Sequence, residues 1–299
     1  MKILNFGSCN VDYVYLLDHI VAPGETEATD KLSVFPGGKG LNQSIALARA
    51  GADVYHAGCI GEDGAFLADM LRENGVNVTH LKRVNAKNGH AVIQVSREGE
   101  NSIFLFPGSN TMIEQADIDR VLENFGTGDL VLLQNEINNL DYIIKKAHAR
   151  GMRIALNPSP CNETVLALDL TKLTYLILNE IEAKTLSGKE AAAEALAYFK
   201  AQYPALTVVL TRGKQGSVYQ DSSTTHHQES LCVKAVDTTA AGDTFTGYFL
   251  ASITAGLKPR DAMQLASFAA GIAVSRRGAA PSIPRLFEVK EAIFGTNKA

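Results

Sequence analysis

The sequence predicts an α/β protein of one domain, residues 1–299, in which helices flank a central, mostly parallel β-sheet and a small β lid projects from it. First, short apolar runs alternate with helical patterns and are joined by short loops, an order typical of right-handed βαβ units. Second, residues 12–36 and 88–106 lack helical periodicity and predict the lid. Third, no internal repeat or low-complexity linker divides the chain.

The first half of the chain begins with a short apolar run and a glycine, which predicts a buried strand at residues 3–6. A glycine-rich turn then precedes a helix whose apolar positions share one face. Alternating apolar and polar residues further on predict two antiparallel strands joined by a tight turn. The expected strands are 31–35, 53–60, 91–95 and 102–106, and the expected helices are 41–50 and 64–74, the second ending at Gly75.

The second half shows the βα alternation most clearly, because four apolar runs are each followed by a helical pattern or a tight turn. Its final part is rich in small residues, which suit closely packed helices. The expected strands are 130–134, 154–157, 175–178, 207–211, 215–220 and 231–236. The expected helices are 140–150, 181–186, 190–203, 241–255 and 260–276.

The composition excludes several classes of protein. Of the 299 residues 46% are apolar and 20% charged, and the formal net charge of −4 at pH 7 leaves no basic surface for nucleic acid. No window approaches about 18 uncharged apolar residues, the length of a membrane span, and the first residues lack the features of a signal peptide. We therefore expect a cytoplasmic protein. Its four cysteines form no CxxC pair, so we expect reduced thiols.

The strongest local motif is a cluster of small residues, 237–242, that stands between an apolar run and a helix and is followed by Asp243. Small residues allow a ligand to approach the backbone, and the unpaired N–H groups of a first helical turn bind anions. Asp243 in that turn has two interpretations. It is either a helix-capping residue, or a base that accepts a proton from an alcohol attacking a bound phosphate.

A second motif is the glycine-rich segment Gly37-Gly38-Lys39-Gly40 at the entrance of the helix 41–50. It permits close approach of a ligand or a turn with positive φ, and Lys39 is either a phosphate ligand or a solvated loop lysine. The chain contains no GxxxxGK[ST], which disfavours a P-loop nucleotidase. It also lacks GxGxxG after the first strand, which disfavours a dinucleotide-dependent dehydrogenase.

Polar residues follow three of the predicted strands at their carboxyl ends. These residues are Asn10, Asp12, Glu136, Asn179 and Glu182. Singly, each is more often a cap or turn former, but ligands of open parallel sheets bind beyond the carboxyl ends of strands. We therefore expect these side chains to line one crevice.

These motifs, taken in order, resemble the ribokinase-like, or phosphofructokinase-B-type, carbohydrate kinases over nearly the whole chain. The matching segments are Gly7-Ser8-x-Asn10-x-Asp12, Pro23-Gly24-Glu25-Thr26, Gly37-Gly38-Lys39-Gly40-x-Asn42-Gln43, Gly61-Glu62-Asp63, Asn157-Pro158, Asn179-Glu180-x-Glu182-Ala183, Thr211-x-Gly213-x-x-Gly216, Asp237-Thr238-x-Ala240-Ala241-Gly242-Asp243-Thr244-Phe245 and Arg276-x-Gly278-Ala279-x-Pro281-Ser282-x-Pro284. The resemblance implies the ribokinase-like fold with a small β lid, and transfer of the γ-phosphate of ATP to a primary hydroxyl.

The resemblance also implies roles for residues around the transferred group. Asp243 matches the catalytic base, and the N–H groups of Ala240, Ala241 and Gly242 match the anion hole. The residues that match sugar contacts are Asn10, Asp12, Gly38, Lys39, Asn42, Glu136 and Asp243 itself. The residues that match nucleotide contacts are Asn179, Thr211, Gly213, Gly216, Gly242 and Ser267.

Two cations are implied in the same way. Glu182 matches a residue that holds Mg²⁺, brought in with ATP, through water. The residues that match an activating K⁺ site are Asp237, Thr239, Ala273, Arg276, Gly278 and Ser282. The β lid is implied to close over the sugar and to join two subunits in a homodimer.

D-ribose, giving ribose 5-phosphate, is the acceptor that the resemblance favours. The alternatives are another pentose, fructose, 2-keto-3-deoxygluconate or a nucleoside as acceptor, or a sugar-binding regulator without catalysis. Three features depart from the family pattern. Ser267 stands where a His or Asn that contacts the adenine is common. The bulky segment Phe104–Gly108, and Pro36 with His90 near the sugar, bear on the identity of the acceptor.

Overall fold

The computed structural model describes residues 1–296, and in this part of the chain nine strands form one sheet. Its order is β13-β12-β11-β10-β9-β8-β1-β4-β5; the pairs from β11 to β5 are parallel, and β12 and β13 are antiparallel additions at one edge. The strands are β1 Lys2–Phe6, β4 Asp53–Ile60, β5 Asn77–Arg83, β8 Leu130–Gln134, β9 Arg153–Asn157, β10 Tyr175–Asn179, β11 Thr207–Thr211, β12 Ser217–Gln220 and β13 Thr225–Gln228.

The direction of strand succession reverses between β1 and β8. From β1 the chain continues outward to β4 and β5, whereas from β8 it continues through β9, β10 and β11 toward the other edge. A ligand crevice is expected where the succession of an open parallel sheet reverses, outside the carboxyl ends of the strands. Asn10, which follows β1, and Glu136, which follows β8, lie at this reversal.

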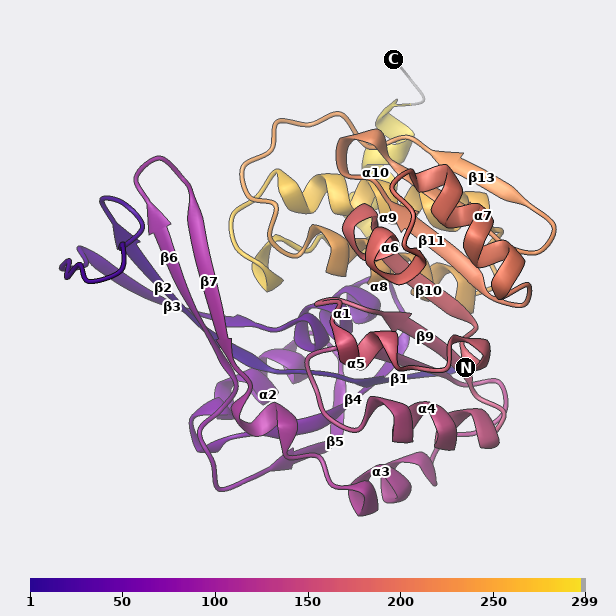
Figure 1. Cartoon of the computed structure of the whole chain (residues 1–299), viewed down its shortest axis with the longest axis horizontal. Helices are drawn as coiled ribbons and strands as arrows, with labels where there is room; N and C mark the ends of the chain where they lie inside the picture. The colour runs from indigo at the N-terminus through magenta and orange to yellow at the C-terminus, as the bar shows by residue number, and fades with distance from the viewer. Residues whose placement is uncertain (297–299) are drawn as a thin grey trace.

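Helices cover both faces of the sheet, and each face has its own apolar core (Figure 1). On one face lie α1 Lys39–Arg49, α2 Ala65–Glu73, α8 Ala241–Thr254, α9 Pro259–Val274 and α10 Leu286–Thr296. On the other lie α3 Gln115–Leu122, α4 Leu140–Ala149, α5 Glu163–Leu166, α6 Glu180–Ser187 and α7 Ala192–Gln202. Successive residues of a strand point to opposite faces, so Ile3 packs in the first core and Leu4 in the second. No helix within residues 1–296 combines the length and the apolar character needed to cross a bilayer.

A second sheet of four strands projects from one side of the body (Figure 1). Its order is β3-β2-β6-β7, formed by β2 Asn10–Leu17, β3 Lys31–Gly37, β6 His90–Ser96 and β7 Asn101–Phe106. We call it the lid sheet. The strands expected at 91–95 and 102–106 are confirmed as an antiparallel pair, with Gly99 at φ 87° in the connecting turn.

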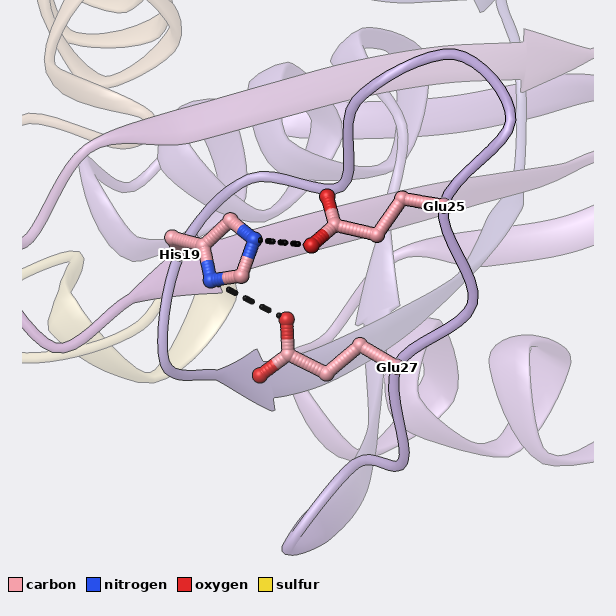
Figure 2. A group of neighbouring side chains, drawn as sticks. All are labelled: His19, Glu25 and Glu27. Carbon is pink, nitrogen blue, oxygen red and sulfur yellow. Dashed lines mark hydrogen bonds and ion pairs between the residues drawn. The ribbon is translucent and has the colours of Figure 1, made fainter.

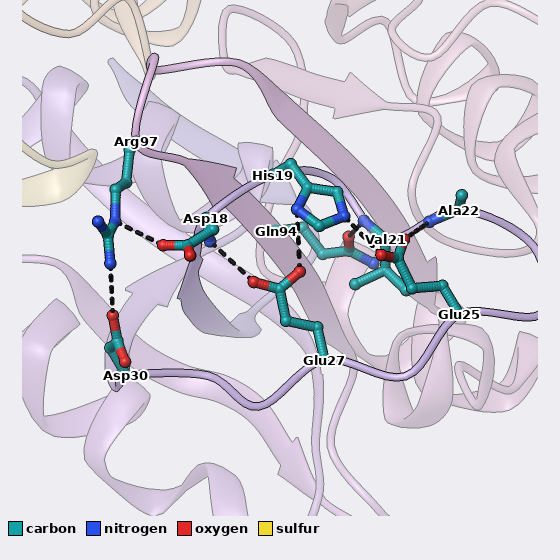
Figure 3. A network of polar contacts seen from close by, with 9 residues as sticks. All are labelled: Asp18, His19, Val21, Ala22, Glu25, Glu27, Asp30, Gln94 and Arg97. Atoms are coloured by element: carbon teal, nitrogen blue, oxygen red, sulfur yellow. Dashed lines mark hydrogen bonds and ion pairs between the residues drawn. The ribbon is translucent and has the colours of Figure 1, made fainter.

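The loop at the tip of the lid sheet, residues 18–30, carries a network of charged groups (Figures 2 and 3). The imidazole of His19 lies between two carboxylates, with Nε2 2.8 Å from Glu25 and Nδ1 3.1 Å from Glu27. Arg97, from the turn between β6 and β7, contacts Asp18 at 2.6 Å and Asp30 at 3.4 Å. We call this set the tip network, and its side chains are largely exposed.

Most predicted elements are confirmed within one or two residues, but one strand is wrong and several elements were missed. Residues 231–236, expected as a strand, form a loop. Their apolar side chains are not part of a sheet, because Leu231 packs on Gly271 of α9 and the N–H of Val236 donates to the Val274 carbonyl at its end. The helices and strands that were not predicted are β2, β5, β13, α3, α5 and α10.

Candidate functional site

Asp243 lies in the first turn of α8, as predicted from the small-residue motif. The helix begins after Ala240, which adopts the left-handed conformation at φ 60° and turns the chain sharply into the helix. The N–H groups of a first turn have no acceptors within the helix, although Ala241 makes a long bond of 3.3 Å to the Thr238 carbonyl. The Asp243 side chain is buried. A carboxylate therefore lies beside backbone groups that suit an anion.

Two side-chain amides of α1 hold this carboxylate, one at each oxygen. Asn42 Nδ2 donates to Asp243 Oδ2 at 3.0 Å, and Gln43 Nε2 donates to Oδ1 at 2.9 Å. The two helices approach closely because Gly247, one turn beyond Asp243, has no side chain to meet Ala46 of α1. Asn42 is also buried, and its Oδ1 lacks a hydrogen-bond donor.

Lys39 lies in the same crevice, so its alternative as a solvated loop lysine is not what the structure shows. Burial disfavours its charged form, but three nearby carboxylates outweigh burial and raise its pKa above the usual value; these are Asp243, Glu136 and Glu182. The backbone N–H of Lys39 donates to Glu136 at 3.0 Å, and the Ser8 hydroxyl donates to the same carboxylate oxygen. Burial raises the pKa of Glu136. A positive charge therefore lies close to the three carboxylates.

Asp12 and Asn10 lie on β2, at the base of the lid sheet. Asp12 lies directly over Gly37, where any side chain would occupy the same space. Burial, and to a lesser degree the charge of Glu136, raises the pKa of Asp12 to about 7. Asn10 is buried, and its Oδ1 accepts a hydrogen bond from Asn110 at 2.6 Å. Both residues are thereby brought to the side of the crevice that holds Glu136.

Three cavities lie along the crevice, and two of them meet at the start of α8. One, of about 200 Å³, is lined by Lys39, Asn179, Glu182, Gly242 and Asp243 among others. A second, of about 290 Å³, has mainly apolar walls and shares Thr211, Thr238, Ala241 and Gly242 with the first. A third, of about 450 Å³, is lined by Asn10, Glu136 and the segment Leu105–Pro107. Asp243 thus lies where a polar cavity meets a larger apolar one.

Asn179 and Glu182 form a reciprocal capping box at the start of α6. Asn179 Oδ1 accepts from the Glu182 N–H at 2.9 Å, and Glu182 Oε2 accepts from the Asn179 N–H at 3.0 Å. Both residues also line the 200 Å³ cavity. The helix-capping role that the sequence suggested for them is confirmed. Glu182 Oε1 takes no part in the cap.

The walls of the 290 Å³ cavity include the remaining residues predicted for a nucleotide. Gly213 and Gly216 have φ of 52° and 82°, and a side chain at Gly216 would collide with the Gln228 carbonyl. Thr211 ends β11, and Ser267 of α9 donates to the Glu229 carbonyl at 2.8 Å. The geometry thus gathers these four residues around one apolar space.

Of the residues predicted for a monovalent cation, Asp237, Thr239 and Gly278 are joined by hydrogen bonds at the loop before α8. Asp237 joins two segments, because its Oδ1 accepts from Thr239 N–H and its Oδ2 from Gly278 N–H, each at 2.9 Å. Hydrogen bonds stabilise the charged form of Asp237 and lower its pKa despite partial burial. Ala273 and Arg276 are linked by a backbone bond at the end of α9, and Ser282 is fully buried.

Other clusters lie apart from this crevice. The tip network contains the His19, Glu25 and Glu27 group, whose atoms lie close enough to share an ion. However, the two carboxylates face opposite nitrogens of the ring (Figure 2), so in this arrangement they do not converge on one ion. Cys9 and His56 contact one another in the core, and all four cysteines are free, as predicted.

Sequence reasoning missed the residues that hold Asp243 from behind. Gln43, Gln134 and Asn157 are joined by hydrogen bonds next to the carboxylate. Gln43 stands in the quoted glycine-rich motif, and Gln134 and Asn157 are the last residues of β8 and β9. The signal available was their position at the carboxyl ends of strands, which was applied to other residues but not to these.

Comparisons with known proteins agree with this geometry. The family model "pfkB family carbohydrate kinase" matches residues 1–286. A ribokinase of Schizosaccharomyces pombe is 36% identical over 97% of this chain and 96% of its own length. The crystal structure of Cryptococcus neoformans ribokinase in complex with ADP has a TM-score of 0.86 and 32% identity, covering 97% of this chain and 99% of that one.

A structure of Arabidopsis thaliana ribokinase complexed with ribose and ATP has a TM-score of 0.84 and 27% identity, over 97% of each chain. The family resemblance, the α/β fold and the carbohydrate-kinase activity predicted from the sequence are therefore confirmed. The chain belongs to the pfkB family of carbohydrate kinases and is an ATP-dependent phosphotransferase.

Proposed function

We propose that the protein converts D-ribose and ATP to ribose 5-phosphate and ADP. The observation that carries this proposal is the position of Asp243, a buried carboxylate at the start of α8 where the polar and apolar cavities meet. Ribose as the acceptor is supported by the relatives, which are named ribokinases and include a complex with ribose and ATP.

In this proposal Asp243 removes the proton from the primary hydroxyl of the sugar. The resulting oxygen attacks the γ-phosphorus, and the bond from that phosphorus to the β–γ bridging oxygen breaks, so that ADP leaves with the electron pair. Backbone N–H groups of Ala240, Ala241 and Gly242 and the ammonium of Lys39 stabilise the negative charge of the transferring group. Lys39 suits this role because its pKa is raised and it stays charged.

The sugar is assigned to the side of Asp243 where the lid sheet begins. Glu136 and Asn10 line the cavity there, and Gly38, whose φ of 95° disfavours any other residue, lies against the backbone of Asn10. Asn42 supplies the buried acceptor that lacks a donor. Asp12 supplies a carboxylate that accepts two hydroxyls when it is ionised.

The nucleotide is assigned to the 290 Å³ cavity. Its apolar walls suit an adenine ring, and it joins the polar cavity at Ala241 and Gly242, where phosphates would meet the helix. The cavity is also lined by Thr211, Gly213, Gly216 and Ser267. Because Ser267 already donates to the Glu229 carbonyl, it offers the base an acceptor rather than a donor.

Mg²⁺ accompanies ATP and neutralises phosphate charge when it is bound. Glu182 fits it, since Oε1 is left uncommitted by the capping box and an oxygen that contacts a hydrated ion suits magnesium. Asn179 keeps Glu182 in place through the reciprocal bond. K⁺ prefers oxygen ligands, and oxygen atoms are supplied by Asp237, Thr239, Ala273, Arg276, Gly278 and Ser282. K⁺ bound there would brace the loop that ends at Ala240.

The lid sheet is proposed to cover the sugar and to join two copies of the chain, with the whole chain acting as one domain. The face of the sheet that carries Asp12 also carries Val14, Phe35, Ile93, Ile103 and Leu105 by strand alternation and register. Phe35, Ile103 and Leu105 are exposed in the single chain. A homodimer through this face would bury them and exclude water from the site.

A panel of acceptors in an assay that couples ADP release to a recorded signal tests the function. Ribose, 2-deoxyribose, fructose, 2-keto-3-deoxygluconate and adenosine are each compared with and without K⁺. We expect the highest kcat/KM on ribose, a phosphorylated product and faster turnover with K⁺. Full activity on adenosine alone would overturn the ribose proposal, and sugar binding without any ADP release would indicate a regulator.

A further inference from the structure

Behind Asp243 the structure holds a chain of neutral amides, of which only Asn157 borders the 200 Å³ cavity. It begins at Gln43, whose Nε2 donates to Asp243 Oδ1 and to Asn157 Oδ1, each at 2.9 Å. Gln43 Oε1 in turn accepts from Gln134 Nε2 at 2.7 Å, and the same nitrogen donates to Asn5 Oδ1 at 3.0 Å. Gln43, Gln134 and Asn5 are fully buried.

The two ends of this chain determine which way each amide faces. Asn157 Nδ2 donates to the Ile177 carbonyl at 2.9 Å, so its Oδ1 must face Gln43. Asn5 Nδ2 donates to the Gly40 carbonyl at 2.8 Å, so its Oδ1 must face Gln134. A backbone carbonyl accepts and never donates. Gln134 must then present its NH₂ group to both neighbours, and Gln43 must present its NH₂ group to Asp243.

This orientation of the amides is unfavourable at one atom, the side-chain oxygen of Gln134. Gln134 Oε1 is buried and has no donor, which is unfavourable by itself. Turning Gln134 over would place that oxygen against the oxygens of Asn5 and Gln43. The Gln43 amide would then have to turn as well, and its carbonyl would face the Asp243 carboxylate. The unsatisfied oxygen at Gln134 is the less costly alternative.

We propose that Gln43 is a positioning residue for Asp243, and that Gln134 and Asn5 lock its amide in the donating orientation. The proposal rests on the proposed role of Asp243 as the base. Gln43 keeps one carboxylate oxygen bonded and so fixes the direction in which the other oxygen, shared with Asn42, meets the sugar hydroxyl. A buried carboxylate without such donors is free to rotate, and misplacement by about 1 Å costs on the order of 100-fold in rate.

Gln43→Met is the first test, because methionine has similar length and volume but offers no donor. We expect kcat to fall roughly 10- to 100-fold, with KM for ribose and ATP changed by less than about threefold, since Gln43 contacts neither. The matched control is Gln220→Met. Gln220 is also buried, but its amide donates to the Leu196 carbonyl at the far edge of the sheet. The control should keep wild-type kcat.

A second variant tests the lock itself without touching Asp243. Gln134→Met removes the donor to Gln43 Oε1, so the Gln43 amide is held only by its own bonds to Asp243 and Asn157 and is less firmly fixed. We expect a smaller fall in kcat, about three- to tenfold, again with little change in KM. If Gln43→Met fails to fold, which its melting temperature would show, Gln134→Met carries the test by itself.

A double variant separates positioning from general damage. If Gln43 acts through Asp243, adding Gln43→Met to Asp243→Ala should leave the residual rate unchanged within about twofold, because the group it positions is gone. A further loss equal to that of the single variant would overturn the proposal, as would wild-type kcat in Gln43→Met. If Asp243→Ala itself kept near wild-type turnover, the base assignment would fail instead, so the two failures are distinguishable.

Discussion

The protein holds polar groups in two different ways, in the buried amide chain behind Asp243 and in the tip network of the lid sheet. The amide chain uses neutral side chains around one carboxylate, and all of them except Asn157 are fully buried. Even His56, which the Ser44 hydroxyl connects to Asn5 at the end of this chain, is neutral, because burial lowers its pKa to about 4. The tip network uses full charges on exposed side chains, with Arg97 and His19 set among carboxylates.

The difference follows from solvent. Exposed ion pairs contribute little and weaken with salt, so they permit a loop to open and close. Neutral amides in the interior cannot exchange their partners for water and therefore fix a geometry. Asp243, the group proposed to do the chemistry, is held by buried neutral amides. The loop at the tip of the proposed lid is held by exposed ion pairs.

The largest effect should come from replacing the carboxylate that the amide chain surrounds. Asp243→Asn keeps the shape but removes the base, so we expect kcat to fall about 10²- to 10⁴-fold. Calorimetry should show ribose binding close to that of the wild type, because the other sugar contacts remain. A variant that retained more than about a tenth of wild-type kcat would contradict the base role.

Lys39→Met should have the next largest effect. It removes the positive charge between the carboxylates, so we expect kcat to fall on the order of 100-fold, the range for loss of one preorganised charge donor. The control is Lys200→Met, at an exposed position of α7 far from the crevice. Equal kcat in the two variants, measured at saturating ATP and ribose, would show that Lys39 does not act on the transferring phosphate.

Asp12→Asn should make the protein more stable but weaken sugar binding. The unfolded chain releases the Asp12 proton near pH 4, whereas the folded protein holds it to about pH 7. Stability of the wild type therefore falls as pH rises from 4 to 7. We expect the variant to gain on the order of 4 kcal/mol at pH 8 and nothing near pH 4. Urea unfolding at both pH values checks this, and an equal gain at both would contradict it.

The smallest effect is expected at the tip network. Hydrogen bonding to Glu25 and the charges of Glu25 and Glu27 raise the pKa of His19 above its usual 6.5. Protonated His19 therefore contributes fully to the order of the loop 18–30 below pH 6.5. This contribution is lost as the pH rises through the raised pKa of His19. Titration of the His19 ring signals by NMR should give this raised pKa, lowered by Glu25→Gln and by added salt. An unchanged pKa of His19 in Glu25→Gln would show that the carboxylates of the tip network do not control His19.

The elements that the sequence predicted best are those whose causes are local. Apolar runs located the parallel strands other than β5, and the small residues before Asp243 located the start of α8, because both depend on neighbours in the chain. The segment 231–236 was misread because its apolar side chains meet α9 and a cavity rather than a sheet.

The amide chain could not be predicted in the same way. Gln43 bonds to Gln134 and Asp243, which are 91 and 200 residues away in sequence. A buried glutamine has no pattern that names its partner, and its orientation depends on carbonyls at Gly40 and Ile177. Such contacts exist only once the sheet order has brought β1, β8 and β9 side by side.

A structure of the protein with ribose and an unreactive ATP analogue tests the central claim most directly. We predict that the primary hydroxyl oxygen of ribose lies within about 3.2 Å of an Asp243 carboxylate oxygen, and that the γ-phosphate meets the first turn of α8 in line with that hydroxyl. If the hydroxyl contacted Glu136 instead, with Asp243 bonded only to Asn42 and Gln43, Asp243 would be a structural carboxylate and not the base.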